Sequence, residues 1–150
     1  MQRAIELAGK GMENGFGGPF GAVVVKDGTI IGEGYNRVTA TNDPTAHAEM
    51  MAIREACRHL HSFQLDGCTI YSSCEPCPMC LGAIYWARPE KVYYACTSKD
   101  AAAIDFDDHH IYEELQKPDG QRRIKFERIM RPEALKILRQ WEEKTDKKSY

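Results

Sequence analysis

The sequence has no run of about eighteen apolar residues, so it has no segment that could span a membrane. Its amino end, MQRAIELAGKGMENG, lacks the unbroken apolar stretch of a secretory signal peptide. It also lacks a basic surplus, because its net charge is −2 and its pI is near 6.2, whereas proteins that follow a phosphate backbone usually carry one. We therefore expect a cytoplasmic protein that acts on a small molecule, with no nucleic-acid or membrane partner.

Internal repeats and low-complexity segments are absent as well, which excludes fibrous and solenoid architectures. A length of 150 residues fits one domain with one core. The composition, with 43% hydrophobic and 28% charged residues, is usual for a globular protein. We therefore expect a single domain over residues 1–150.

Local patterns in the first half predict two helices and a hairpin. Apolar residues at helical spacing indicate a helix over residues 2–14. The β-branched runs on either side of Asp27-Gly28 predict a β-hairpin with a tight two-residue turn. Asp43 followed by proline is typical of a helix N-cap, so a second helix is expected over residues 44–59.

The middle of the chain has the pattern of a strand, a helix and a second strand. Short apolar strands are predicted over residues 68–72 and 91–95, and a helix over residues 77–87 lies between them. Two strands joined through a helix form a parallel crossover. The remaining predictions are a helix in two pieces over 99–115, a weak strand over 124–130 and a final helix with Ala134, Leu138 and Trp141 on one face.

Half of the six cysteines lie in the segment SCEPCPMC, as Cys74, Cys77 and Cys80. Disulfides are rare in a reducing cytoplasm, so clustered cysteines there indicate metal ligands or a redox pair. We expect the scattered cysteines to be buried small hydrophobic residues. These are Cys57, Cys68 and Cys96.

One histidine and two of the cysteines form a candidate zinc site. His47 lies near the start of one predicted helix, and Cys77 and Cys80 lie in the first turn of another. Three protein ligands leave a fourth position for water, which is the catalytic arrangement of Zn²⁺. Backbone N–H groups at both helix starts favour ionised thiols. Zinc there would lower the pKa of its water from about 15.7 to about 7.

Glu49 is the candidate proton carrier. It lies two residues after His47, about 200° around a regular helix, whereas two ligands on one helix face are normally four residues apart. A carboxylate there can pass a proton from the zinc water to a leaving nitrogen. The order H-x-E followed by P-C-x-x-C, with Pro76 27 residues after Glu49, is the signature of zinc nucleobase deaminases.

Cys74 leaves a second interpretation open. It forms its own C-x-x-C with Cys77, and a fourth protein ligand would close the zinc and make it structural. We favour Cys74 outside the ligand set, because it falls at the end of the strand and Pro76 directly precedes Cys77 as the signature requires. The alternative is a non-catalytic zinc domain that acts in protein interaction.

Over nearly its whole length the sequence resembles the cytidine deaminase superfamily and, within it, the small bacterial guanine deaminases. The segments that carry the resemblance are GGPFGAVVVKDG, NDPTAHAEM, SCEPCPMCLGAIYWARP, DAAAIDFDDHHIYEEL and the terminal tyrosine. The first three are shared among purine-type deaminases and indicate the reaction. The stretch with FDD and Tyr150 points to guanine as the base.

The resemblance implies a three-layer α/β/α fold with a central five-stranded mixed sheet, a Zn²⁺ cofactor and a homodimer whose carboxy-terminal segment can be exchanged between subunits. It also implies that guanine is hydrolysed to xanthine and ammonia. The residues it assigns to the base are Asn36, the backbone of Ala48, Phe20 and Trp86 as walls, Asp108 at the polar edge and Tyr150 as a closing residue.

Asp108 suits guanine for a chemical reason. The N1–H and the C2 amine of guanine are adjacent donors, for which a carboxylate is the natural acceptor. Adenine and cytosine lack this pair, so a buried carboxylate opposite them would stay unsatisfied at a cost of about 1–3 kcal/mol. Without the resemblance, Asp105, Asp107 and Asp108 read as a solvated acidic turn. Guanosine deamination and tRNA adenosine deamination remain rival activities with the same chemistry.

Overall fold

The computed structural model describes residues 1–149, and the predicted site residue Tyr150 lies outside the described residues. The chain forms two compact units, Met1–His109 and His110–Tyr150. Every other predicted site residue belongs to the first unit. The site is therefore built on the first unit.

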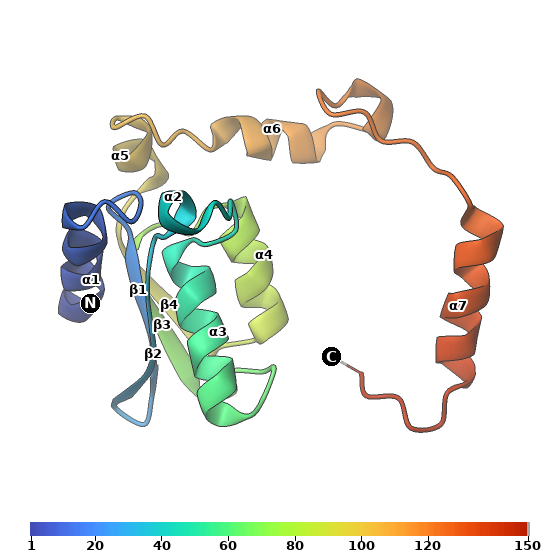
Figure 1. Cartoon of the computed structure of the whole chain (residues 1–150), viewed down its shortest axis with the longest axis horizontal. Coiled ribbons are helices and arrows are strands. Elements are labelled where there is room, and N and C mark those ends of the chain that lie inside the picture. The colour runs from blue at the N-terminus through green and yellow to red at the C-terminus, as the bar shows by residue number, and fades with distance from the viewer. Residues whose placement is uncertain (150) are drawn as a thin grey trace. The chain divides into compact units, whose positions relative to one another are not determined.

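The first unit contains a mixed sheet of four strands in the order β2-β1-β3-β4 (Figure 1). Strand β1 (Gly21–Lys26) pairs antiparallel with β2 (Thr29–Tyr35) on one side and with β3 (Cys68–Cys74) on the other. Strand β4 (Lys91–Cys96) pairs parallel with β3. This confirms the predicted parallel crossover, which leaves β2 and β4 as the edge strands.

The β1–β2 hairpin has the predicted two-residue turn. Lys26 pairs with Thr29, and the intervening Asp27 and Gly28 have φ angles of 49° and 76°. Two consecutive positive φ angles are the requirement of a type I′ turn, which asparagine, aspartate and glycine meet most readily. The turn chemistry therefore fixes the register next to the turn, and the register shifts by one residue between Val24 and Val25.

Helices cover both faces of the sheet (Figure 1). Helix α1 (Gln2–Glu13) packs on one face against β1, β2 and β3, and α3 (Ala48–Leu60) packs on the other face against β1 and β2. Helix α4 (Pro78–Ala87) lies beside α3. This confirms the predicted three-layer α/β/α fold. The core between the sheet, α3 and α4 includes Val24, Ala52, Leu65, Ile70 and Ile84.

Glycines on β2 allow α3 to approach the sheet closely. A Cβ atom on Gly34 would lie 2.1 Å from the carbonyl oxygen of Ala48, and one on Gly32 would lie 2.4 Å from that of Ala52. Neither contact is sterically possible, so these positions exclude a side chain. The glycines thus set the position of the first turn of α3, which carries Glu49.

One predicted helix starts later than expected, and one further helix was not predicted. The helix predicted over 44–59 begins four residues later, at Ala48. The side chain of Asp43 accepts hydrogen bonds from the N–H and hydroxyl of Thr45, at 2.8 and 2.7 Å, and so stabilises a local turn before the helix. A short helix that was not predicted, α2 (Val38–Thr41), precedes this turn.

The predicted fifth strand is wrong. Residues 124–130 form no strand, and the described residues contain one sheet of four strands. A strand is stable only with a hydrogen-bonded neighbour. This segment belongs to the second compact unit, in which the described residues form no strand that could pair with it.

The remaining elements follow the predicted order. The two helical pieces over 99–115 are confirmed, with a break around Phe106, and the final helix is confirmed. Among the described residues, no helix is long and apolar enough to cross a membrane. The bounds are α5 (Ser98–Ala102), α6 (His109–Gln116), the 3-10 helix η1 (Asp119–Gln121) and α7 (Arg131–Glu143).

Candidate active site

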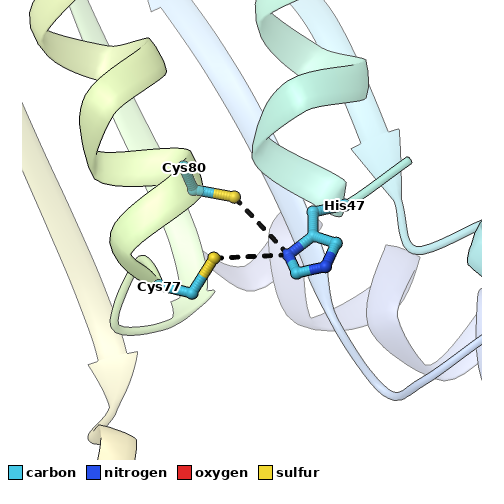
Figure 2. A group of neighbouring side chains, drawn as sticks. All are labelled: His47, Cys77 and Cys80. Carbon is cyan, nitrogen blue, oxygen red and sulfur yellow. Dashed lines mark hydrogen bonds between the residues drawn. The ribbon is translucent and has the colours of Figure 1, made fainter. Parts of the chain in front are cut away.

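Three potential metal ligands meet between α3 and α4. Nδ1 of His47 lies 3.5 Å from Sγ of Cys77 and 3.6 Å from Sγ of Cys80, and the ligand atoms all lie within 4.8 Å of one another (Figure 2). Cys80 is buried, and His47 and Cys77 are partly buried. The structure therefore brings the three predicted ligands together.

Helix starts position these ligands. His47 is the N-cap of α3, Cys77 is the N-cap of α4 with Pro78 at its first position, and Cys80 lies in the first turn of α4. Proline at the first position loses no hydrogen bond there and holds φ near its helical value. The unpaired N–H groups of both first turns favour negative charge on the sulfur atoms.

Each thiol affects the ionisation of the other. The hydrogen bond from Cys80 lowers the pKa of Cys77, and the one with His47 lowers it further, although burial opposes both. The same Cys77–Cys80 bond raises the pKa of Cys80, together with burial and the nearby charge of Glu49. A bound cation would favour ionised sulfur atoms here, because a coordinating thiol is deprotonated.

The donor set fits zinc. Zn–N bonds of about 2.0 Å and Zn–S bonds of about 2.3 Å at tetrahedral angles place N and S about 3.5 Å apart. The observed separations of 3.5 and 3.6 Å match this value. His47, Cys77 and Cys80 would thus hold the ion with three protein ligands.

Cys74 does not join this group among the described residues. Its Sγ donates instead to the carbonyl oxygen of Thr97, at 3.5 Å. Burial raises the pKa of Cys74 to about 11, so this thiol is poorly suited to ionise as a ligand. The geometry therefore favours three protein ligands over four.

Glu49 lies beside the ligands in a buried position. Its side chain is 6% exposed, and burial raises the pKa of its carboxyl. Its Oε1 accepts a hydrogen bond from the Ser72 hydroxyl at 3.1 Å, and its Oε2 accepts one from the Cys80 thiol at 3.4 Å. The carboxyl is thus held at a fixed orientation next to the metal group.

Asp108 also lies near this group. Burial raises the pKa of its carboxyl, and the charge of Cys77 raises it further. In turn, Asp108 contributes to the raised pKa of His47, which results mainly from the hydrogen bond with Cys77. A residue far along the sequence from both ligand motifs is thus close enough to affect them electrostatically.

A model of the cytidine and deoxycytidylate deaminase zinc-binding region matches residues 1–96. The chain belongs to this deaminase family. The match includes His47, Glu49, Cys77 and Cys80, the residues described above. Membership of this family is consistent with the α/β fold and with the three side chains that could hold a metal ion.

The chain is similar to other deaminases over most of its length. It is 55% identical to guanine deaminase of Bacillus subtilis over 150 residues, which cover 100% of this chain and 96% of the relative. The X-ray structure of a guanine deaminase from Bacillus subtilis matches with a TM-score of 0.96 and 56% identity, over 99% of this chain and 95% of that one. The tRNA-specific adenosine deaminase of Aquifex aeolicus is 40% identical over 120 residues, 80% of this chain and 77% of the relative.

Within this deaminase framework, Asn36 and Ala48 are both buried, and Ala48 belongs to the hydrophobic core. Oδ1 of Asn36 accepts a hydrogen bond from the N–H of Val38 at 3.1 Å, which fixes the amide at the end of β2. Phe20 packs edge-on against Phe106, with ring centroids 5.0 Å apart. Phe20 is thus placed with the segment that leads to Asp108.

Trp86 is not brought to the buried side of α4. Its side chain is 64% exposed, whereas Cys80, Ile84 and Ala87 form the buried face of the helix. Trp86 follows Ile84 by two residues, about 200° around the helix. Within one chain, this places Trp86 on the outer face of α4, so its role as a wall of the pocket stays a prediction.

Two residues of the site were missed by sequence reasoning. Ser72 is an internal strand residue whose hydroxyl binds Glu49, and Phe106 is the aromatic partner of Phe20. Ser72 could have been found from its polar side chain within an apolar strand, because buried hydroxyls need a partner. Phe106 belongs to the FDD stretch, but its contact with Phe20 left no local signal, since it joins segments far apart in the sequence.

Proposed function

We propose that this chain is a zinc-dependent guanine deaminase that hydrolyses guanine to xanthine and ammonia. The observation that carries the chemistry is the buried Glu49 beside the His47, Cys77 and Cys80 group. The choice of guanine is supported by Asp108 near that group and by 55% identity to a guanine deaminase over the whole chain. Because the ligand thiols must stay reduced, the cytoplasm is the compartment that suits this enzyme.

The proposed reaction exchanges an amine for oxygen at C2 of the base. Zinc in this site supplies Lewis acidity that lowers the pKa of a water molecule from about 15.7 to about 7. Glu49 takes a proton at its carboxylate and passes it to the C2 amine nitrogen, which leaves as ammonia. The Ser72 hydroxyl holds Oε1, so the carboxylate keeps its orientation through both proton transfers.

The remaining residues of the site are proposed to bind and orient the base. Asn36 directly follows β2, Ala48 is the first residue of α3, and both are buried. Phe20 supplies an apolar wall. Asp108 accepts from the N1–H and amine of guanine. Those two donors offset the loss of hydration that raises its pKa.

Asp108→Asn is expected to lower kcat/KM for guanine by roughly 10- to 100-fold. A charge-assisted hydrogen bond contributes roughly 1.5–3 kcal/mol, and the substitution removes the charge. The asparagine side chain also has an NH₂ group, which would face a donor of the base instead of an acceptor. The matched control is Asp107→Asn, which keeps the oxygen that accepts from the N–H of His109. The measurement is ammonia release from guanine, guanosine, adenine, cytosine and adenosine in tRNA.

The same assay separates guanine from its rivals. A tRNA adenosine deaminase is the second candidate, because the chain is 40% identical to one over 120 residues. The net charge of this chain, −2, is unfavourable for binding an RNA loop. Faster turnover of guanosine or of tRNA than of guanine would show that the chemistry is right and the substrate is not. Full guanine activity in Asp108→Asn would contradict the role of Asp108 in binding the base.

We further propose that residues 1–150 act as one deaminase domain in a homodimer, in which the carboxy-terminal segment with Tyr150 is exchanged and Tyr150 closes the partner's site. Large apolar side chains of α7 are exposed, and no residue of α7 is buried in the described chain. An amphipathic helix gains its stability by burying such a face. On α4, the exposed Tyr85 and Trp86 offer a second apolar surface.

Light scattering is expected to give the mass of two chains at micromolar concentration. Removing residues 131–150 should weaken the association, because it removes α7 together with Tyr150. A monomer in the full-length protein would contradict the dimer, and a truncated protein that remains fully dimeric would contradict exchange of this segment.

A further inference from the structure

Two cysteines outside the metal group face each other across the β3–β4 ladder. Cys74 and Cys96 are the last register partners of these parallel strands. Neighbouring strands lie about 4.7–4.9 Å apart, which falls inside the Cα separation of about 4.4–6.8 Å found across disulfides. Side chains of paired residues project from the same face of a sheet. The backbone therefore places the two side chains on the same face of the sheet, at a Cα separation that a disulfide can span.

The two thiols differ in access to solvent. Cys74 is 7% exposed, whereas Cys96 is exposed at the end of the edge strand β4. This corrects the expectation that Cys96 would be buried, while Cys68 is buried as predicted and Cys57 is partly buried. The reason is its place at the open edge of the sheet. Solvent access is one condition for a cysteine to react with an oxidant, and a second thiol beside it can resolve the product.

An electrostatic interaction supports this proximity. The pKa of Cys74 is raised mainly by burial, and the charge of Cys96 is the next cause. The Sγ of Cys74 donates a hydrogen bond to the carbonyl oxygen of Thr97, the residue directly after Cys96. The Cys74 thiol therefore points toward the end of β4.

We propose that Cys74 and Cys96 are a peroxide-reactive pair that closes to a disulfide. The Cys96 thiolate attacks one oxygen of hydrogen peroxide, so an S–O bond forms, the O–O bond breaks and hydroxide leaves. The Cys74 sulfur then attacks the sulfenic sulfur of Cys96. An S–S bond forms, the S–O bond breaks, and water leaves with the proton of Cys74. Peroxide is the oxidant, and both thiols are oxidised.

The disulfide would enclose the crossover that carries two metal ligands. The chain between Cys74 and Cys96 contains Cys77 and Cys80. Its two ends are already tied, because the N–H of Glu75 donates to the carbonyl oxygen of Cys96 at 2.9 Å, and Oε2 of Glu75 accepts from the N–H of Ser98 at 2.9 Å. The bond therefore adds to an existing connection and is expected to stabilise the crossover.

The test treats the zinc-loaded full chain with hydrogen peroxide, then maps its peptides without reduction. We expect a peptide that links Cys74 to Cys96, with the mass of two hydrogens lost. The midpoint of thermal unfolding should rise by about 5–10 °C, as expected for closing a loop of this size, and should return after dithiothreitol. Cys96→Ser should lose both effects, and Cys57→Ser should keep them.

A second variant identifies the order of the steps. In Cys74→Ser, Cys96 has no resolving thiol, so a sulfenic acid that dimedone traps should accumulate on Cys96. Oxidation of Cys96 to sulfinic acid in the unmodified protein while Cys74 stays a thiol would overturn the proposal. Oxidation of Cys77 or Cys80 with loss of zinc, while Cys74 and Cys96 remain reduced, would overturn it equally.

Discussion

Glu49→Gln is expected to lower kcat on guanine by roughly 10²–10⁴-fold, the usual contribution of a general acid–base group. Glutamine keeps the size of the side chain and an oxygen that can accept from the Ser72 hydroxyl, which lies 3.1 Å from Oε1. It cannot take up and release the proton. The KM and the zinc content should therefore change little, and the loss should appear in kcat.

The matched control for this variant is Glu55→Gln on the same helix. Glu55 is exposed, and its Oε2 accepts from the N–H of Glu33 at 2.7 Å, a bond that a glutamine oxygen can keep. Steady-state kinetics with metal analysis on both variants make the comparison. If Glu49→Gln kept half of the activity, another group would have to move the protons.

The metal ligands and Glu49 could be predicted because the information is local. In H-x-E and P-C-x-x-C, the spacing within each motif and the helix start beside it determine where the side chains lie. The structure places His47 and Cys77 at the N-caps of their helices, next to the predicted positions. An error of four residues in the start of α3 did not affect the site, because His47 is still at the start of the helix, as its N-cap, and Glu49 lies in its first turn.

Predictions that required a neighbour in space were less successful. The weak strand over 124–130 depends on another strand to pair with, and the burial of Cys96 depends on whether a further element covers β4. The hydrogen bond from Ser72 to Glu49 joins residues 23 positions apart. None of these relations leaves a periodic pattern in the sequence, so local propensity could not supply them.

Cys80→Ser and Cys77→Ser are each expected to lose zinc and to have no measurable deaminase activity. Removing a residue that only supports a ligand typically lowers metal affinity by roughly 10–100-fold, so removal of a ligand should exceed that effect. Metal content after dialysis, activity and circular dichroism should be measured together. The spectrum separates loss of the ion from loss of the fold.

Cys74→Ser is the matched control, because it makes the same atomic change at a cysteine three residues from Cys77. Its thiol donates to the carbonyl oxygen of Thr97 at 3.5 Å and lies outside the ligand group, and a serine hydroxyl can also donate. This variant should keep about one zinc per chain and most of its activity. Loss of zinc from Cys74→Ser would mean a fourth protein ligand and no position for water. The site would then be structural, and the proposed hydrolysis could not occur there.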